Sequence, residues 1–339
     1  MRGRREVYVS SFKNVHLDIY VIGYSKQGES IVAVLWDCEK PIYCAVTDSY
    51  LSDDQINHTE ELLRTCHIET IDDFLWTHPD EDHSKGIVHL LENFSKPNKT
   101  HVFLPEGINK DESREAEMNY LMSEFDNNRR YSYTHVNVDT DEEIREIKRL
   151  KLIDSTNSNV YSYFKLSFLL PNSAVSARAV NETKQFEPND ISLVYCITYN
   201  GFYYFFGGDM MNKMVQFLPN NKTDLTDTDF VNRIRYIKIP HHSSNNTDKL
   251  VSYFKRNNLK DAVSVTTIFK NERLPKKSII DKYCNMSSYV GSTDTGDCPY
   301  GHILTSFSTN SEFIGHNAEG NAKEIKVDNK IIREDYLSF

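Results

Sequence analysis

The chain has 339 residues, of which 39% are hydrophobic and 26% charged, and its formal net charge is −10. This composition is typical of a folded globular protein with one large domain or two small ones. The negative charge excludes a protein that coats nucleic acid with an overall basic surface. A local basic patch with bound metal cations would still accommodate a nucleic acid or nucleotide-like substrate.

Three features bear on localisation. Residues 1–6 are basic but lack the apolar segment of a signal peptide, and the longest apolar run, Ile31–Trp36, is too short to span a bilayer. None of the six cysteines forms a C-x-x-C pair, which favours free thiols in a reducing compartment. We therefore expect a cytoplasmic protein without membrane contact. Its protein partners cannot be predicted from these features.

The first part of the chain alternates strand-like and helix-like patterns. Short runs of β-branched and aromatic residues, interrupted by glycine or charged residues, predict strands. Apolar residues at helical spacing, such as Leu62, Leu63 and Cys66, predict helices. In chain order the predicted elements are strands at 17–22, 31–36 and 41–46, a helix at 53–66, a strand at 72–76 and a helix at 85–94.

Residues 106–150 differ in character, because they are charged, helical in pattern and poor in β-branched residues. We predict a helical, charged insertion at 106–165, which could act as a lid. The elements predicted around and beyond it are strands at 160–170, 192–199, 202–206, 236–239 and 262–269, with helices near 246–257 and 276–284. The two strand-rich portions are alike in character. This favours an α/β fold with two facing sheets in a single domain over 1–339.

A dense group of metal-binding side chains follows the predicted strand at 72–76. His78, Asp80, Asp82 and His83 lie within six residues, directly after the apolar run 74–76. Side chains this close together point at one spot only if the backbone leaves the strand and curls. An acidic turn would explain the three acids alone, but the two histidines favour a metal site.

Two later strands also run directly into metal-binding residues. Residues 203–206 lead to Gly207-Gly208-Asp209, and residues 236–240 lead to His241 and His242. Ligands at the ends of neighbouring strands converge on one edge of a sheet. The two glycines let the backbone approach an ion closely, and the carboxylate that follows can bridge two cations. On extended backbone two adjacent rings point oppositely, so we expect one histidine as a metal ligand.

The ligand types carry information about the metal. Neutral imidazoles with several carboxylate oxygens suit Mn, Fe or Zn better than Mg. Asp80 makes the set richer in oxygen, which favours Mn, while Zn stays open. We predict one or two divalent metal ions, Zn or Mn. The predicted ligands are His78, Asp80, Asp82, His83, Asp209 and His241.

The segment His78-Pro79-Asp80-Glu81-Asp82-His83 resembles the H-x-H-x-D-H motif of the metallo-β-lactamase fold superfamily, with Asp in place of the second His. This substituted form is similar to the hydrolase domain of the competence protein ComEC and its soluble relatives. The resemblance covers roughly residues 15–310 and implies an αββα four-layer sandwich with a dinuclear metal site on one edge. Further segments with a likeness to that branch are 23–30, 47–49, 189–194, 208–209, 239–244 and 293–296.

The chain also departs from the family pattern. The histidine that the family places before the Ser-Leu-Val strand is missing, and Glu187, Asn189 or Asp190 occupies its neighbourhood. Leu274 stands where a late histidine often lies, and Ser243 replaces the glycine of the H-H-G-S segment. We therefore expect a second metal that is weakly held, or that is completed by His241 or His242.

The residues and the resemblance together favour a metal-dependent hydrolase of phosphodiesters, and specifically a nuclease, that uses a metal-activated water. Asp82 is expected to orient or deprotonate the nucleophile, and His241 or His242 to hold the phosphate or protonate the leaving oxygen. Two alternatives remain open. One is a hydrolase of a small molecule, such as a cyclic nucleotide, an ester or an amide. The other is a binding or scaffold module of the same fold that has lost turnover.

Overall fold

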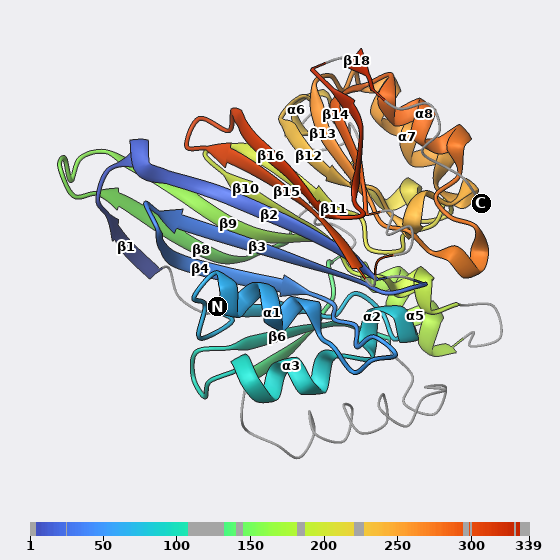
Figure 1. The fold of residues 1–339 in the computed structure, drawn as a ribbon, viewed down its shortest axis with the longest axis horizontal. Coiled ribbons are helices and arrows are strands. Elements are labelled where there is room, and N and C mark those ends of the chain that lie inside the picture. Colours follow the sequence, from blue (N-terminus) through green and yellow to red (C-terminus); the bar gives the residue numbers. More distant parts are fainter. Residues whose placement is uncertain are drawn as a thin grey trace.

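A computed structural model describes most of the chain. The described residues are 5–24, 26–107, 132–139, 145–181, 187–219, 227–293, 298, 300–328 and 330–332. They form two mixed β-sheets, one of eight strands and one of ten, with helices on the outer sides (Figure 1).

The eight-stranded sheet carries the first strands of the predicted series. Its strand order is β16 (Phe313–Gly320), β15 (Tyr300–Ser308), β2 (Val15–Tyr24), β3 (Glu29–Asp37), β4 (Lys40–Thr47), β5 (Asp73–Leu75), β6 (His101–Pro105) and β7 (Ser132–Val136). Strands β4 to β7 run parallel. The crossovers that parallel neighbours require contain the helices α1 (His58–Thr65) and α3 (Ile87–Phe94).

The ten-stranded sheet contains most of the later strands. Its order is β1 (Arg5–Val9), β8 (Arg145–Asp154), β9 (Tyr161–Leu170), β10 (Val194–Tyr199), β11 (Phe202–Phe206), β12 (Ile234–Lys238), β13 (Ala262–Thr266), β14 (Ser287–Ser292), β17 (Lys323–Val327) and β18 (Lys330–Ile331). Strands β11 to β14 are parallel. The other helices of the described residues are α2 (Glu81–Ser84), α5 (Ser173–Asn181), α6 (Asp227–Asn232), α7 (Asp248–Arg256) and α8 (Lys277–Cys284).

Three hydrophobic cores hold these layers together. The central core joins the two sheets, and in it Tyr43 of β4 packs on Phe164 of β9 with ring centroids 4.8 Å apart. A second core places Leu63 of α1 and the apolar face of α3 on the eight-stranded sheet. A third places Phe254 of α7 and Ile280 of α8 on the ten-stranded sheet. The described residues therefore form the helix–sheet–sheet–helix layering that the sequence predicts.

Within the predicted helical insertion, the residues of β7 and β8 form strands, so the prediction of helix is wrong for these two segments. Residues 132–136 extend the eight-stranded sheet, and 145–154 pair with β1 and β9 in the other sheet. In β8, Leu150 and Leu152 point into the central core and Lys151 between them reaches Glu6 at 3.0 Å. This alternation is the period of a strand, and the charged residues are its outer face. Residues 108–131 and 140–144, also within the predicted insertion, lie outside the described residues.

The cysteines are all free thiols. Cys44, Cys196 and Cys284 are buried and pack in the cores as small apolar side chains. Among the helices that the structure describes, none has both the length and the apolar character needed to cross a lipid bilayer.

Candidate metal centre

The metal-binding residues lie where strands of the two sheets end next to one another. The turn after β5 is joined to the other sheet through the backbone N–H of Leu193, which donates to the Thr77 carbonyl at 2.8 Å. The turns after β11 and β12 are joined through the N–H of His241, which donates to the Gly208 carbonyl at 3.1 Å. Three segments that are distant in sequence thus meet at one edge of the sandwich.

Gly208 is required for this close approach. Its φ is +50°, and a side-chain carbon there would lie 2.3 Å from Ser192 Oγ. The same hydroxyl accepts a hydrogen bond from the backbone N–H of Asp209 at 2.9 Å. The glycine therefore lets the turn after β11 pack directly on Ser192, which fixes the position of the Asp209 carboxylate.

The short helix α2 brings the first group of ligands together. Asp80 lies just before the helix, and Asp82 and His83 lie in its single turn. His78 Nε2 is 3.5 Å from Asp80 Oδ2, and His83 Nε2 is 3.4 Å from Asp82 Oδ2. Asp209 faces both rings, since its Oδ1 lies 3.6 Å from His83 Nε2 and its Oδ2 lies 4.0 Å from His78 Nε2.

Of the adjacent histidines, His242 is the one whose ring joins this group. Its Nε2 lies 3.2 Å from Asp82 Oδ2 and 3.8 Å from Asp209 Oδ2. His241 is partly exposed, and after His83 and His242 it is a further cause that lowers the pKa of Asp209. The extended backbone assumed from the sequence is wrong, because His241, His242 and Ser243 all have left-handed φ values of 47°, 47° and 61°. Such backbone strain is common at functional sites.

We call these six residues the ligand cluster: His78, Asp80, Asp82, His83, Asp209 and His242. Three of its buried atoms, His78 Nε2, His83 Nε2 and Asp209 Oδ1, have no hydrogen-bond partner among the described residues. A buried polar atom without a partner costs about 1–3 kcal/mol, so three of them facing one another need an explanation. Imidazole nitrogens and carboxylate oxygens are ligands of Zn and Mn, and the ligand cluster therefore fits a divalent metal site.

Mutual charge favours the ionised forms of Asp82, His83 and Asp209. Burial alone would raise the pKa of Asp209, but His83 and His242 hold it well below its ordinary value. Burial likewise opposes ionisation of Asp82, and the same two rings lower its pKa. Burial would lower the pKa of His83, yet Asp82 and Asp209 raise it well above its ordinary value. A divalent cation would take the place of these protons as the positive partner of the carboxylates.

A hydrogen-bond network behind the rings fixes which nitrogen faces the cluster. Asp48 Oδ2 accepts from His83 Nδ1 at 2.7 Å and from the Thr77 hydroxyl at 2.6 Å. Since that hydroxyl donates to Asp48, its oxygen is left to accept from His78 Nδ1 at 3.0 Å. The network therefore keeps a proton on Nδ1 of both rings. When a cation replaces any proton on Nε2, each ring would present the lone pair of that nitrogen to it.

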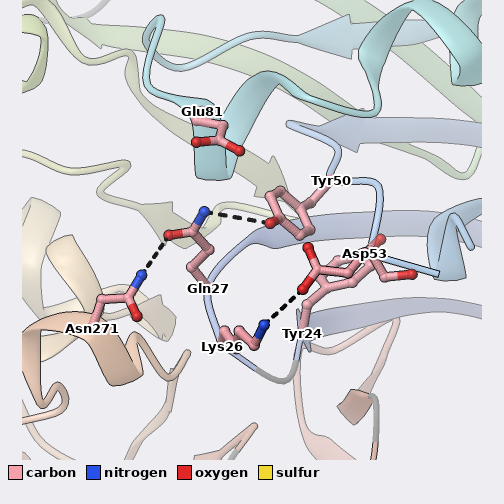
Figure 2. Close-up of a pocket in the computed structure, with 8 residues that line it drawn as sticks. Tyr24, Lys26, Gln27, Tyr50, Asp53, Glu81 and Asn271 are labelled. Carbon is pink, nitrogen blue, oxygen red and sulfur yellow. Dashed lines mark hydrogen bonds and ion pairs between the residues drawn. The ribbon is translucent and has the colours of Figure 1, made fainter. Parts of the chain in front are cut away.

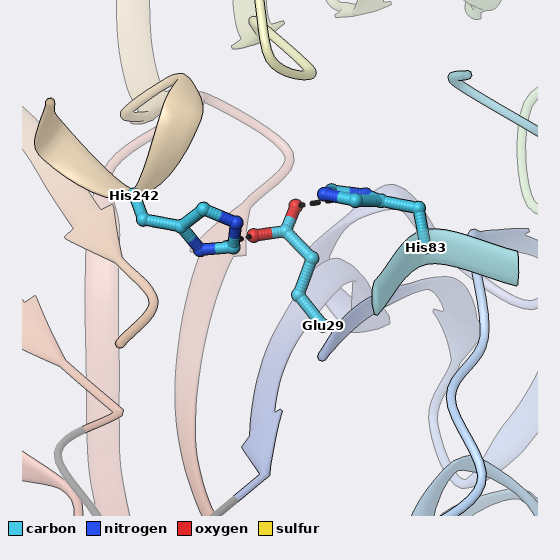
Figure 3. Close-up of side chains that lie close together, drawn as sticks. All are labelled: Glu29, His83 and His242. Carbon is cyan, nitrogen blue, oxygen red and sulfur yellow. Dashed lines mark ion pairs between the residues drawn. The ribbon is translucent and has the colours of Figure 1, made fainter. Parts of the chain in front are cut away.

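His242 is held in the same way by a second carboxylate, Glu29. The Thr267 hydroxyl donates to Glu29 and accepts from His242 Nδ1 at 2.8 Å. Figure 3 shows Glu29 between His83 and His242, and its oxygens lie 4.0 Å and 3.5 Å from their Nδ1 atoms. Glu29 is 1% exposed, and the buried ammonium of Lys238 lies 2.8 Å from its Oε2.

Glu29, His83 and His242 are close enough to form a metal-binding group of their own. Two observations argue against a cation there. The Lys238 ammonium already occupies the positive position beside the carboxylate. The Nδ1 atoms that face Glu29 carry protons in the network, because their other partners are acceptors. Glu29 is therefore a positioning residue. No local sequence pattern singles out Glu29, since its partners lie far along the chain.

The other residues considered from the sequence lie outside the ligand cluster. Asp190 pairs with Lys213 and, with Glu187, caps a short 3₁₀ helix. Leu274 is 1% exposed and its backbone pairs with Phe269. Asn189 lies in the same 3₁₀ helix as Asp190, the Ser243 hydroxyl bonds Thr266 at 2.7 Å, and residues 294–296 lie outside the described residues.

Replacing Asp48 by alanine is expected to weaken metal binding about 10- to 100-fold, because the His83 ring loses the partner that orients it. Competition with a chromogenic chelator measures this affinity. Asp37→Ala is the control, since Asp37 bonds Ser10 near the chain's first strand. Equal affinities in the Asp48 variant and the control would contradict the role of Asp48.

Comparison with known proteins gives distant structural similarity only. No protein-family model and no curated protein matches the sequence. The chain is similar to a diphosphatase from the PhnP family, with a TM-score of 0.37 and 12% identity over 73% of this chain and 85% of that one. It is also similar to the metallo-β-lactamase fold protein YhfI from Bacillus subtilis, with a TM-score of 0.32 and 11% identity over 71% and 92%. The layering and the ligand cluster described above rest on this chain's own cores and contacts.

Proposed function

We propose that the chain is a metal-dependent hydrolase of phosphodiesters, with nuclease activity the specific expectation. The observation that carries the proposal is the set of three buried, unpartnered atoms of His78, His83 and Asp209, each aimed at the others. The likeness of residues 78–83 to the ComEC hydrolase motif supports the same proposal, and we further propose that the chain belongs to that branch. Such sites activate water for attack on phosphorus.

The ligand cluster meets at the Asp209 carboxylate. His78 and His242 face its Oδ2 and His83 faces its Oδ1. Asp80 lies beside His78, and Asp82 lies beside His83 and His242. These residues would hold one or two divalent cations, with Asp209 at the centre of the set. Bound there, Zn or Mn would supply a more acidic water and would offset the negative charge that develops on phosphate oxygens.

The chain's own groups provide the remaining functions. The Asp80 side chain is 40% exposed, whereas those of Asp82 and Asp209 are 12% and 5% exposed. Substrate therefore approaches from the side of Asp80. Asp82 lies between His83 and His242 and is placed to orient the nucleophile. His241 is partly exposed beside Asp209, where it can bond a phosphate oxygen or protonate the leaving group.

Removing metal from the purified protein with a chelator is expected to lower hydrolysis of bis(4-nitrophenyl) phosphate by about 100-fold or more. Dialysis into Mn or Zn should restore the rate, and a parallel assay on single- and double-stranded DNA and RNA tests the nuclease expectation. Undiminished hydrolysis in the metal-free protein would contradict the proposal. Absence of both bound metal and hydrolysis would instead favour a binding module.

A further inference from the structure

The structure contains a pocket of about 220 Å³ whose lining residues are mostly polar. Figure 2 shows the side chains around it, with Gln27 between Asn271 and Tyr50. The lining residues are Tyr24, Lys26, Gln27, Tyr50, Ser52, Asp53, Glu81 and Asn271. None of them is a member of the ligand cluster, so the pocket is a separate feature of the surface.

The segments that line the pocket are the ones that build the metal centre. Glu81 is flanked by two members of the ligand cluster, and Gln27 lies two residues before Glu29. Tyr50 lies two residues after Asp48, the partner of His83. Asn271 lies two residues after Phe269, whose ring centroid is 5.3 Å from that of His242. A molecule held at the ligand cluster can therefore extend into the pocket.

Uncharged hydrogen-bonding groups form part of the pocket wall. Gln27 accepts from Asn271 Nδ2 at 2.9 Å and donates to the Tyr50 hydroxyl at 3.4 Å. The faces of the Tyr50 ring are occupied, because Gly28 packs against the ring and the Lys85 ammonium lies 5.3 Å from its centroid. Its hydroxyl and ring edge are thus what it offers to a ligand.

The charges of the wall are already paired. Asp53 Oδ2 lies 2.8 Å from the Lys26 ammonium, and Glu81 Oε1 lies 3.8 Å from the Lys85 ammonium. A ligand with a net charge would have to compete with these pairs. The wall instead suits an uncharged group that has both donors and acceptors, which carboxamides recognise through paired hydrogen bonds.

We propose that this pocket binds the uncharged ring, sugar or nucleobase, of a phosphate ester whose phosphate lies at the metal centre. The volume supports a single ring, since pockets for whole drug-sized molecules are about 300–1,000 Å³. The inference rests on the proposed function and deepens it. It makes the substrate a nucleotide-like ester and gives Gln27 and Asn271 a role in specificity.

The test compares three chromogenic substrates with the Mn- or Zn-loaded protein. They are bis(4-nitrophenyl) phosphate, the 4-nitrophenyl ester of thymidine 5′-phosphate, and the corresponding deoxyribose ester without the base. We expect wild-type protein to have a higher kcat/KM for the thymidine ester than for bis(4-nitrophenyl) phosphate. In the Gln27→Ala/Asn271→Ala variant the ratio of these two kcat/KM values should fall about 10-fold. The kcat/KM for bis(4-nitrophenyl) phosphate itself should stay unchanged within about twofold.

The matched control is Asn317→Ala, an exposed amide on the edge strand β16 that does not line the pocket. A fall in kcat/KM of the double variant that is confined to the thymidine ester would show that the pocket binds the base. A fall shared by the thymidine and deoxyribose esters would show that it binds the sugar. An unchanged ratio of kcat/KM values in the double variant, or an equal fall in kcat/KM on all three substrates, would overturn the inference.

A binding measurement separates the pocket from the proposed function. Calorimetric titration with thymidine 5′-monophosphate does not depend on turnover. Failure of wild-type protein to hydrolyse any of the three esters would count against the proposed function alone. Weaker nucleotide binding in the double variant would then still support the pocket, and equal binding in wild type and variant would overturn it.

Discussion

Replacing Asp209 by alanine is expected to reduce phosphodiester hydrolysis by about 10³-fold or more, which corresponds to about 4 kcal/mol of transition-state stabilisation. The reason is its central position. Its two oxygens face His78, His83 and His242, and it is 3% exposed. Steady-state rates with bis(4-nitrophenyl) phosphate measure the loss, and metal content per chain should fall with the rate.

The control for this variant is Asp73→Ala, which removes another buried carboxylate. Asp73 is 1% exposed and accepts a hydrogen bond from the Tyr43 hydroxyl at 2.7 Å within the eight-stranded sheet. Circular dichroism tells whether each variant is folded. A folded Asp209→Ala protein that keeps wild-type activity and wild-type metal content would contradict the role of Asp209.

Replacing Glu29 by glutamine is expected to lower the stability of the fold strongly. This change leaves the Lys238 ammonium, which is 0% exposed, without its charged partner. Breaking a buried ion pair from one side lowers the free energy of unfolding by about 3–5 kcal/mol. Chemical denaturation of the metal-free protein measures the change. Metal affinity should also weaken, because the Thr267 hydroxyl that holds His242 loses its carboxylate acceptor.

The dependence of this effect on pH follows from the pKa of Glu29. Burial would raise that pKa, but Lys238, His83 and His242 lower it from its ordinary value of 4.5. A carboxyl group with a lowered pKa in the folded state stabilises the fold above about pH 4.5, and this contribution is lost as the pH falls further. The difference in stability between wild type and Glu29→Gln should therefore narrow in acid.

Two comparisons test the buried pair itself. The double variant Glu29→Gln/Lys238→Met removes both charges and should recover part of the lost stability. Lys277→Met breaks an exposed pair with Asp281, where the side chains are about half exposed, and should cost less than about 1 kcal/mol. If Glu29→Gln and Lys277→Met lowered the free energy of unfolding by the same amount, the buried pair would contribute no more to stability than the exposed one.

The ligands that follow strand ends could be predicted because their signal is local. Four lie within six residues after an apolar strand, and Asp209 and the His241-His242 pair follow equally clear strands. Which of the two histidines faces the site could not be predicted. The answer depends on left-handed backbone at both positions, and that conformation is set by contacts with the turn after β11.

Other features depend on contacts between distant segments. Glu29 meets Lys238 across 209 positions and Thr267 across 238, so no window of sequence shows the pair. The sequence pattern does not predict the strand β8, for a different reason. Its charged residues resemble a solvated helix face, and only their pairing with β1 and β9 shows that they alternate with buried leucines.

Hydrolysis is expected to depend on cations that the ligand cluster binds. Anomalous X-ray diffraction from crystals grown with Zn locates such ions directly. We expect a peak about 2.0–2.2 Å from His78 Nε2, or from His83 Nε2 and an oxygen of Asp209. Strong peaks elsewhere in the molecule, with none within bonding distance of these three side chains, would contradict a metal centre at the ligand cluster.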